Sequence, residues 1–251
     1  MQEYTVHSFD DMLGAIAAFN SAHGHYAWFR GQKDYTWSLK PSVKRPPYHQ
    51  NKVEQYMATS FYTEACTRMK DHPSHDDMSG WLCLMQHYGL PTRILDWSKS
   101  PLVALYFAVH TAGDDDPCNE IDAGLWLMDP MNLNMDQGYG EYIPPMDYRS
   151  VADMLVPAFN DKAPSNGKII ACCSVENDLR MYVQQSAFTI HGSDEPLNIL
   201  CGHTDIVRKL IIPCDLKPQL RLQLKTLGFH LNTIFPDIEH VASEIKNTYA
   251  F

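Results

Sequence analysis

The sequence predicts an α+β fold in a single domain, with mixed or antiparallel strands in a sheet that helices surround. Strand and helix periodicities are interspersed along the chain without a regular alternation of the two. No strand is followed by a Gly-x-Gly-x-x-Gly turn, which disfavours a doubly wound dinucleotide-binding fold. A chain of 251 residues, 45% of them hydrophobic, can bury one substantial core without disulfides or metals. We therefore expect one domain over residues 1–251.

The first half of the chain contains clear helix signals. Apolar side chains recur every four residues over 53–69, which indicates an amphipathic helix. The Gly-Leu-Pro segment 89–91 ends the next helix, and Pro101 suits the first turn of a third helix that Ser98 or Ser100 can cap. The expected strands are 4–7 and 26–32, and the expected helices are one capped by Ser8 or Asp10 that runs to Phe19, then 50–70, 78–88 and 101–109.

The second half predicts further strands and two closing helices. Residues 129–166 are rich in Pro, Asn, Met, Asp and Gly and have weak periodicity, so we expect an irregular insertion or lid there. Asp114, Asp115 and Asp116 predict an acidic surface loop. The expected strands are 124–128, 168–174, 187–191 and 207–213, and the expected helices lie near 217–227 and 237–247.

Charge and hydropathy exclude some classes of protein. The net charge of -10 argues against a surface that is basic throughout, although it leaves room for a local basic pocket. No stretch approaches the roughly 18 apolar residues of a membrane span. The N-terminal residues 1–4 lack the basic-then-apolar order of a secretory signal. We expect a cytoplasmic protein that does not associate with membranes.

Cysteine and histidine spacing gives no strong metal signal. The seven cysteines are scattered, and no pair has the two-residue spacing of a zinc or redox site, so reduced and mostly buried thiols are expected. His72 and His75, followed by Asp76 and Asp77, are candidate metal ligands, but solvated loop residues are the commoner outcome for such a cluster. We expect no metal.

The densest polar cluster spans residues 86–98, where amide, imidazole, phenol, hydroxyl, guanidinium and carboxylate groups lie between apolar helices. Such a mixture is costly to bury unless its members pair with one another or with a ligand. Arg93 and Asp96 are candidates for a structural ion pair, and the alternative is that they line a pocket. An apolar strand that ends in Arg30 and Gly31 would deliver a cation to the mouth of such a pocket.

The cluster and its surroundings resemble a known family. Gln86-His87-x-Gly89-x-Pro91-Thr92-Arg93-x-x-Asp96-Trp97, followed by Ala104-Leu105-Tyr106-Phe107-Ala108, is similar to the central signature of the Phe-Arg-Gly (FRG) domain family. Trp28-Phe29-Arg30-Gly31-Gln32, Trp37 to Ser42 and Arg45 carry the resemblance together with this cluster. Weaker similarity is carried by the segment 180–190, Lys209 to Pro213, and Leu227 to Asp237. The resemblance spans residues 26–245.

The segments also resemble ADP-ribosyltransferases of the Arg-Ser-Glu class, which implies an ADP-ribosyltransferase-like fold with NAD as the substrate. Phe29-Arg30-Gly31 is similar to the strand whose arginine grips the NAD phosphates. Leu95 to Ser98, leading into the helix, is similar to the second strand of that class. Gln184 and Gln185 occupy the place of the third motif, but neither residue is a glutamate.

The chemistry of these side chains suggests roles. The planar fork of Arg30 suits a pyrophosphate, and Gly31 lets the backbone approach closely. Tyr88 or Trp97 offers a face for the nicotinamide ring. Catalytic candidates are Arg30, His87, Asp96 and Gln185, and candidates for binding NAD are Arg30, Gly31, Gln32, Tyr88, Thr92, Arg93, Trp97 and Ser98.

Two of these candidates carry the expected reaction. Cleavage of the nicotinamide-ribose bond passes through an oxocarbenium-like transition state, so a carboxylate stabilises it, and Asp96 precedes the amides as the candidate. His87 either accepts a proton from the attacking group, hydrogen-bonds a ribose hydroxyl, or is an internal histidine with only a structural role. Arg30 and residues 86–98 must then converge on one cavity sized for a dinucleotide.

We therefore expect an NAD-dependent ADP-ribosyltransferase that acts on a macromolecule, with RNA and DNA as candidate acceptors. The family resemblance implies a toxin or phage-defence effector, restrained by an antitoxin or chaperone. One alternative is a non-catalytic nucleotide-binding or interaction module, which the missing glutamate favours. A further alternative is a nuclease that uses His87 and Asp96.

Overall fold

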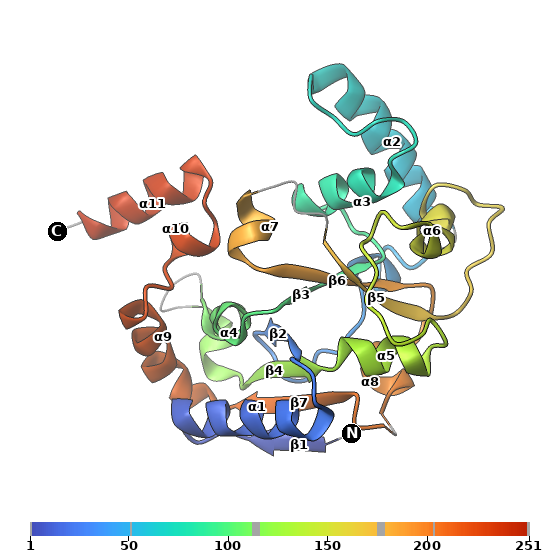
Figure 1. Cartoon of the computed structure of the whole chain (residues 1–251). Helices are drawn as coiled ribbons and strands as arrows, with labels where there is room; N and C mark the ends of the chain where they lie inside the picture. The colour runs from blue at the N-terminus through green and yellow to red at the C-terminus, as the bar shows by residue number, and fades with distance from the viewer. Residues whose placement is uncertain (1, 51, 112–115, 175–178, 203, 250–251) are drawn as a thin grey trace.

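A computed structural model describes residues 2–50, 52–111, 116–174, 179–202 and 204–249 (Figure 1). Within this part of the chain, seven strands form one sheet in the order β1-β7-β4-β2-β3-β6-β5. Strand β1 runs parallel to β7, and the other neighbouring pairs are antiparallel. The sheet is therefore mixed, and the α+β prediction is confirmed. The strands are β1 (Gln2–Thr5), β2 (Trp28–Gln32), β3 (Ile94–Ser98), β4 (Ala123–Met128), β5 (Ile169–Cys173), β6 (Ser186–His191) and β7 (Val207–Ile212).

The helices that the sequence predicts are all present. Ser8 caps the first of them by accepting a hydrogen bond from the amide of Asp11, and Ser100, rather than Ser98, caps the central helix. Pro101 occupies the first turn of that central helix, as expected. These helices are α1 (Phe9–His23), α2 (Val53–Arg68), α3 (Met78–His87), α4 (Pro101–Val109), α9 (Lys217–Thr226) and α11 (Ile238–Thr248).

Several short helices are not predicted from the sequence. They are α5 (Pro130–Asp136), α6 (Arg149–Leu155), α7 (Leu179–Val183), α8 (Leu197–Leu200) and α10 (Leu231–Ile234), together with the 3₁₀ turns η1 (Ser42–Lys44), η2 (Pro117–Glu120), η3 (Val156–Ala158) and η4 (Cys214–Leu216). Helices of one or two turns are too short to show a periodicity. The expected acidic loop lies mostly outside the described residues, since only Asp116 of its three aspartates is described.

The segment 129–166, for which an irregular insertion or lid is expected, contains the short helices α5 and α6 and irregular stretches of chain. Asp129 caps α5 by accepting hydrogen bonds from the amides of Met131 and Asn132. Leu133 in this segment is fully buried, and so is Met146. No described residue of the segment lines the large cavity described below. The segment therefore completes the core instead of covering a site.

Helices cover both faces of the sheet. On one face, α1, α4 and α9 pack on β2, β4 and β7, while α2, α3 and α6 pack on β3, β5 and β6 (Figure 1). Phe29, which packs against the first helix group, is paired with Ser98 of β3. Paired side chains point to the same face of a sheet and side chains alternate along each strand, so the two helix groups lie on the same face. Helices α5 and α8 cover the opposite face, where Trp28, Trp97 and Trp126 are buried.

The sheet opens between β2 and β3. Strands β2 and β4 are paired at five residues, and so are β3 and β6. Strands β2 and β3, in contrast, share only the pair Phe29 and Ser98. The two strands diverge beyond that pair, so the backbone of Arg30 and that of Asp96 are not bonded to each other as in a ladder. This divergence leaves room for the site.

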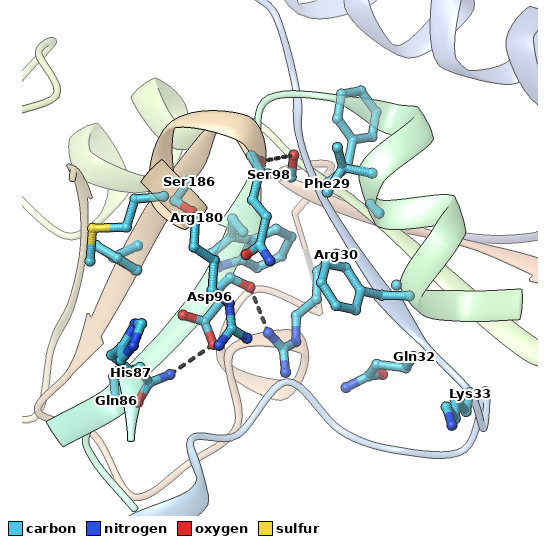
Figure 2. Close-up of a pocket in the computed structure, with 18 of the residues that line it drawn as sticks. Phe29, Arg30, Gln32, Lys33, Gln86, His87, Asp96, Ser98, Arg180 and Ser186 are labelled. Carbon is cyan, nitrogen blue, oxygen red and sulfur yellow. Dashed lines mark hydrogen bonds between the residues drawn. The ribbon is translucent and has the colours of Figure 1, made fainter. Parts of the chain in front are cut away.

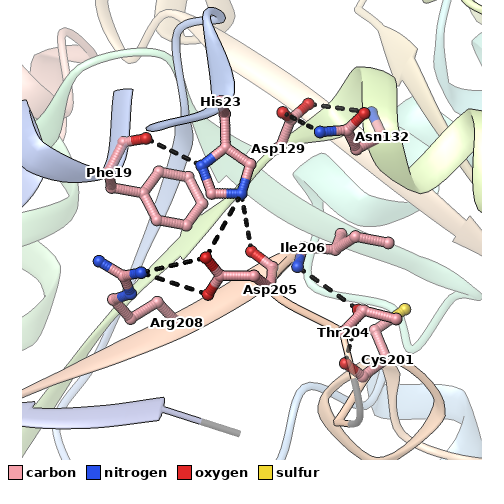
Figure 3. Close-up of polar contacts among 9 residues, drawn as sticks. All are labelled: Phe19, His23, Asp129, Asn132, Cys201, Thr204, Asp205, Ile206 and Arg208. Atoms are coloured by element: carbon pink, nitrogen blue, oxygen red, sulfur yellow. Dashed lines mark hydrogen bonds and ion pairs between the residues drawn. The ribbon is translucent and has the colours of Figure 1, made fainter. Parts of the chain in front are cut away.

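Polar contacts fix the edge of the sheet where α1 ends and β7 begins (Figure 3). The two ring nitrogens of His23 contact the carbonyl oxygens of Phe19 and Asp205 at 2.8 and 2.9 Å. Arg208 pairs with the Asp205 carboxylate at 3.2 Å and lies over the ring of Phe19. These contacts tie the helix to the loop that precedes β7.

No helix in the described part of the chain is long and apolar enough to cross a membrane.

Candidate active site

A cavity of about 560 Å³ lies where β2 and β3 diverge. It is lined by β2, β3 and β6, by helices α3, α4 and α7, and by Trp37 and Arg45 from the loop after β2 (Figure 2). Ligand pockets in proteins are typically of about 300 to 1,000 Å³. Residues of the polar segment 86–98 and the distant Arg30 thus meet at one cavity, whose volume lies within this range.

Positive charge dominates the lining. Arg30, Lys33, Arg45 and Arg180 line the cavity, and Asp96 is the one carboxylate of the described residues that does so. The whole chain has a net charge of -10. A local concentration of cations in an acidic protein favours an anionic ligand at this place.

Arg30 projects from β2 into the gap between the strands. Its Nη1 donates a hydrogen bond of 2.6 Å to the backbone carbonyl of Asp96, an acceptor that a ladder bond would otherwise use (Figure 2). The Nε atom is inaccessible and has no partner in the described structure. Burial lowers the pKa of the Arg30 guanidinium, the Asp96 charge opposes this change, and the positive charge of Arg45 adds to it.

Arg45 is oriented in a similar way. Its Nε and Nη2 donate to the carbonyl oxygen of Lys40 at 2.7 and 2.5 Å. Burial lowers the pKa of the Arg45 guanidinium. Within the described residues, neither Arg30 nor Arg45 forms an ion pair with a carboxylate. Both guanidinium groups are therefore fixed by neutral acceptors, and their charges remain available to a ligand.

Asp96 is the exposed residue in a strand whose other members are buried. Its Oδ2 accepts a hydrogen bond of 2.7 Å from Nε2 of Gln86, at the end of α3 (Figure 2). His87 follows Gln86 and also lines the cavity, with an exposed side chain. His87 is therefore not an internal histidine, and its role as a base stays a prediction.

Trp97 belongs to the cavity lining, but its indole is buried in the core on the opposite face of β3. Its Nε1 donates to the hydroxyl of Thr189 at 3.0 Å, and that oxygen is 2.9 Å from Nε2 of His191. Burial, with Lys44 and Arg30 nearby, lowers the pKa of His191 to about 3. His191 is therefore neutral near pH 7, and its Nε2 can accept the hydroxyl proton of Thr189.

Ser98 and Gln184 connect β3 to α7. The hydroxyl of Ser98 donates to the backbone carbonyl of Gln184 at 2.7 Å and accepts from the amide of Ser100 at 3.0 Å. Gln184 lines the cavity, and its side chain donates to the carbonyl of Ile234. Gln185, the candidate from the sequence, is exposed with φ 47° and does not line the cavity.

Gly31 and Gln32 line the cavity but serve the packing of β2. A Cβ at Gly31 would lie 1.9 Å from the carbonyl oxygen of Ala104, so only glycine permits this approach of α4. The side chain of Gln32 is buried, and its Oε1 accepts from the indole of Trp126 at 2.7 Å.

Three other predicted site residues point elsewhere. Tyr88 is 61% exposed and is not part of the lining. Thr92 is fully buried and donates to Oε1 of Gln86. Arg93 forms a buried ion pair with Glu54, at 2.6 Å, and not with Asp96. The ion pair that the sequence suggested between Arg93 and Asp96 is therefore wrong, because side chains three positions apart in an extended segment point to opposite sides.

Arg180 is a cation of the site that sequence reasoning did not select. Its guanidinium lies 4.8 Å from the ring centre of Phe235, which also packs against Phe107 of α4. The only signal was its place in the weakly similar segment 180–190, where the five-residue helix α7 is too short to show a pattern.

The alternative metal ligands do not form a site. Nδ1 of His72 contacts the carbonyl of Pro73, and Nδ1 of His75 contacts the hydroxyl of Tyr62. Within the described residues, no group of three or more His, Cys, Asp or Glu side chains is placed to hold a metal ion. All seven cysteines are free thiols that are buried or partly buried, as expected.

Comparison with known families adds to this geometry. Residues 25–117 match the family model described as the FRG domain. This segment of the chain is similar to an FRG domain. The matched region supplies Arg30, Arg45 and Asp96, whereas α7 and β6 complete the same cavity from beyond the matched FRG segment. No curated protein and no solved structure matches the chain.

Proposed function

We propose that the cavity binds NAD and that the protein transfers ADP-ribose from it to a macromolecule. The observation that carries the proposal is the pair of guanidinium groups, Arg30 and Arg45, which neutral carbonyls orient and which form no ion pair with a carboxylate of the described residues. A pyrophosphate supplies the charge and the paired acceptor oxygens that such groups bind. The ADP-ribosyltransferase-like character of the fold is part of this proposal.

The rest of the lining suits the other parts of a dinucleotide. Trp37 lines the cavity with a side chain that is 46% exposed, so it is the candidate for stacking on an aromatic ring, whereas the Trp97 indole is 3% exposed in the core and Tyr88 does not line the cavity. The hydroxyl of Ser98 donates to the backbone carbonyl of Gln184, and the side chain of Gln184 donates to the backbone carbonyl of Ile234. Both side chains are therefore held as part of the cavity wall. The apolar side chains of α4 shield the opposite wall from water.

The proposed reaction balances as a simple displacement. The bond between nicotinamide nitrogen and ribose C1′ breaks, and the electron pair leaves with neutral nicotinamide. The carboxylate of Asp96 stabilises the positive charge that develops on the ribose. A nucleophile of the acceptor attacks C1′ and gives its proton to His87, which lines the same cavity.

This assignment departs from the Arg-Ser-Glu pattern, because no glutamate of the described residues lines the cavity. Asp96, on β3, then has to stabilise the positive charge on the ribose in place of the glutamate that the third motif of that class supplies. Its oxygen is oriented by Gln86 at 2.7 Å, which is the kind of preorganisation that the role requires.

The acceptor and the biological setting rest on resemblance alone. RNA and DNA are the proposed acceptors, and a toxin or phage-defence effector in the cytoplasm, restrained by an antitoxin or chaperone, is the proposed setting.

The decisive experiment is incubation of the protein with NAD labelled in the adenylate, together with separate pools of protein, RNA and DNA. Nicotinamide release and transfer of label are measured for the wild type, Asp96→Asn and Arg68→Ala. Asp96→Asn keeps the size of the side chain and removes its charge, so we expect kcat to fall about 100-fold or more. Arg68 is exposed on α2, away from the cavity, and its variant should match the wild type.

Other outcomes separate the alternatives. Binding of NAD without release of nicotinamide would indicate a non-catalytic nucleotide-binding module. Cleavage of nucleic acid that needs no NAD, and that Asp96→Asn abolishes, would indicate a nuclease. Either result would overturn the transferase.

A further inference from the structure

We infer that Thr92 is a positioning residue that acts through Gln86 to hold the carboxylate of Asp96 in one orientation toward the cavity. The inference rests on the proposed function, since Asp96 there stabilises the reacting ribose. Thr92 itself is fully buried and does not line the cavity, so it acts without touching the substrate.

The turn after α3 brings Thr92 back to Gln86. Gly89 adopts φ 77°, a conformation that favours glycine, and the amide of Leu90 bonds to the carbonyl of Met85 at 2.9 Å. The chain therefore reverses at the end of the helix. Six residues after Gln86, the hydroxyl of Thr92 contacts its side-chain oxygen.

The hydroxyl of Thr92 has one proton to donate, and its surroundings decide where that proton goes. Its oxygen accepts from the amide of Ile94 at 3.3 Å. The hydroxyl proton is then directed to Oε1 of Gln86. The carboxylate of Asp96 only accepts, so it takes the NH₂ end of the Gln86 amide and leaves Oε1 facing the hydroxyl as the acceptor of its proton.

This assignment fixes the orientation of the Gln86 amide. With Oε1 facing Thr92, the NH₂ group faces Oδ2 of Asp96 and donates to it at 2.7 Å. The flipped amide would place its oxygen against the carboxylate oxygen, so two acceptors would meet without a proton between them. The carboxylate therefore selects the orientation of the amide, and the hydroxyl of Thr92 stabilises that orientation by donating to Oε1.

Asp96 is held at two points as a result. Arg30 binds its backbone carbonyl at 2.6 Å, and Gln86 binds one side-chain oxygen. An exposed aspartate without such a donor samples several rotamers. Small displacements of a charge from its reacting partner lower the rate much more than they lower binding of the substrate.

The test compares Thr92→Val with Thr92→Ser. Valine keeps the shape and removes the hydroxyl, whereas serine keeps the hydroxyl and removes a methyl group. With NAD as substrate, we expect Thr92→Val to lower kcat by about 10- to 100-fold with KM changed by less than about twofold. Thr92→Ser should stay near the wild type. Urea unfolding confirms that both variants are folded under the assay conditions.

A second measurement does not depend on activity. In ¹⁵N-labelled protein, the side-chain amide signals of Gln86 are identified by their loss in Gln86→Met. We expect these signals to shift toward those of solvated glutamines in Thr92→Val but not in Thr92→Ser. Unchanged Gln86 signals in Thr92→Val, or equal loss of kcat in both variants, would overturn the inference. If the wild type releases no nicotinamide, the proposed function fails and the amide signals alone decide the positioning role.

Discussion

Arg30 and Arg93 belong to the two most recognisable motifs of the chain, yet the structure surrounds them differently. Arg93 is 3% exposed and forms an ion pair with Glu54, with its Nε and Nη2 at 3.0 and 2.6 Å from the two carboxylate oxygens. Arg30 binds only a backbone carbonyl, and its Nε has no partner in the described structure. One guanidinium is neutralised inside the core, and the other faces a cavity.

The difference separates a structural charge from a binding charge. A bidentate pair that is satisfied on both sides stabilises the contact between α2 and the start of β3 and has no capacity left for a ligand. A guanidinium held by a neutral acceptor keeps its charge unbalanced, which costs stability unless a ligand supplies the anion. Two substitutions, Arg93→Met and Arg30→Met, test this distinction.

Arg93→Met should give the largest loss of stability. Glu54 would remain buried without its partner, and breaking a buried pair costs about 3 to 5 kcal/mol. Urea unfolding measures the change. The double variant Arg93→Met with Glu54→Met should recover much of it, because it removes both charges. Arg68→Met, which breaks an exposed pair with Glu64, serves as the control and should cost less than about 1 kcal/mol.

Arg30→Met should show the opposite pattern. Its unfolding free energy should change much less than that of Arg93→Met, because the lost bond to Asp96 is offset by removal of an unneutralised charge. Affinity for NAD, measured by calorimetry, should fall about 10- to 100-fold, as expected for the loss of a charged donor to a phosphate. Equal loss of stability in the two variants, with unchanged affinity, would remove the distinction between them.

The sequence predicted the elements with long periodicity and the convergence of distant motifs. Helix α4 begins and ends at the expected residues, and Arg30 and Asp96 meet at one cavity. It did not separate Arg93, Thr92 and Tyr88 from the residues that line the cavity.

The reason is geometric. Residues 86–98 cross from a helix end through a turn into a strand, and the side on which each side chain falls depends on the turn at Gly89 and on the register of β3. Arg180 was missed because α7 is a single short helix placed by tertiary contacts with Phe235. Such contacts between distant segments leave no local pattern.

The third test concerns the buried residues behind the cavity, where His191 supports Trp97 through Thr189. Burial lowers the pKa of His191 to about 3 in the folded protein, against about 6.5 when unfolded. Above pH 6.5 the histidine is mostly neutral in both the folded and the unfolded state, so it does not change the free energy of unfolding. As the pH falls from 6.5 toward 3, the unfolded state binds a proton that the folded state does not, and stability is lost at about 1.4 kcal/mol per pH unit.

His191→Gln keeps an acceptor for the hydroxyl of Thr189 and cannot titrate, so it should remove this component of the pH dependence. The measurement is the unfolding free energy in urea at several values between pH 5 and 7.5. The wild type should lose about 1 to 2 kcal/mol more than His191→Gln over this range. Carboxylates and other histidines contribute equally to both proteins, and exposed His49→Gln should follow the wild type. Parallel curves for the wild type and His191→Gln would show that His191 accepts its proton without unfolding of the protein. The hydrogen bonds from His191 through Thr189 to the indole of Trp97 would then persist when the histidine is charged.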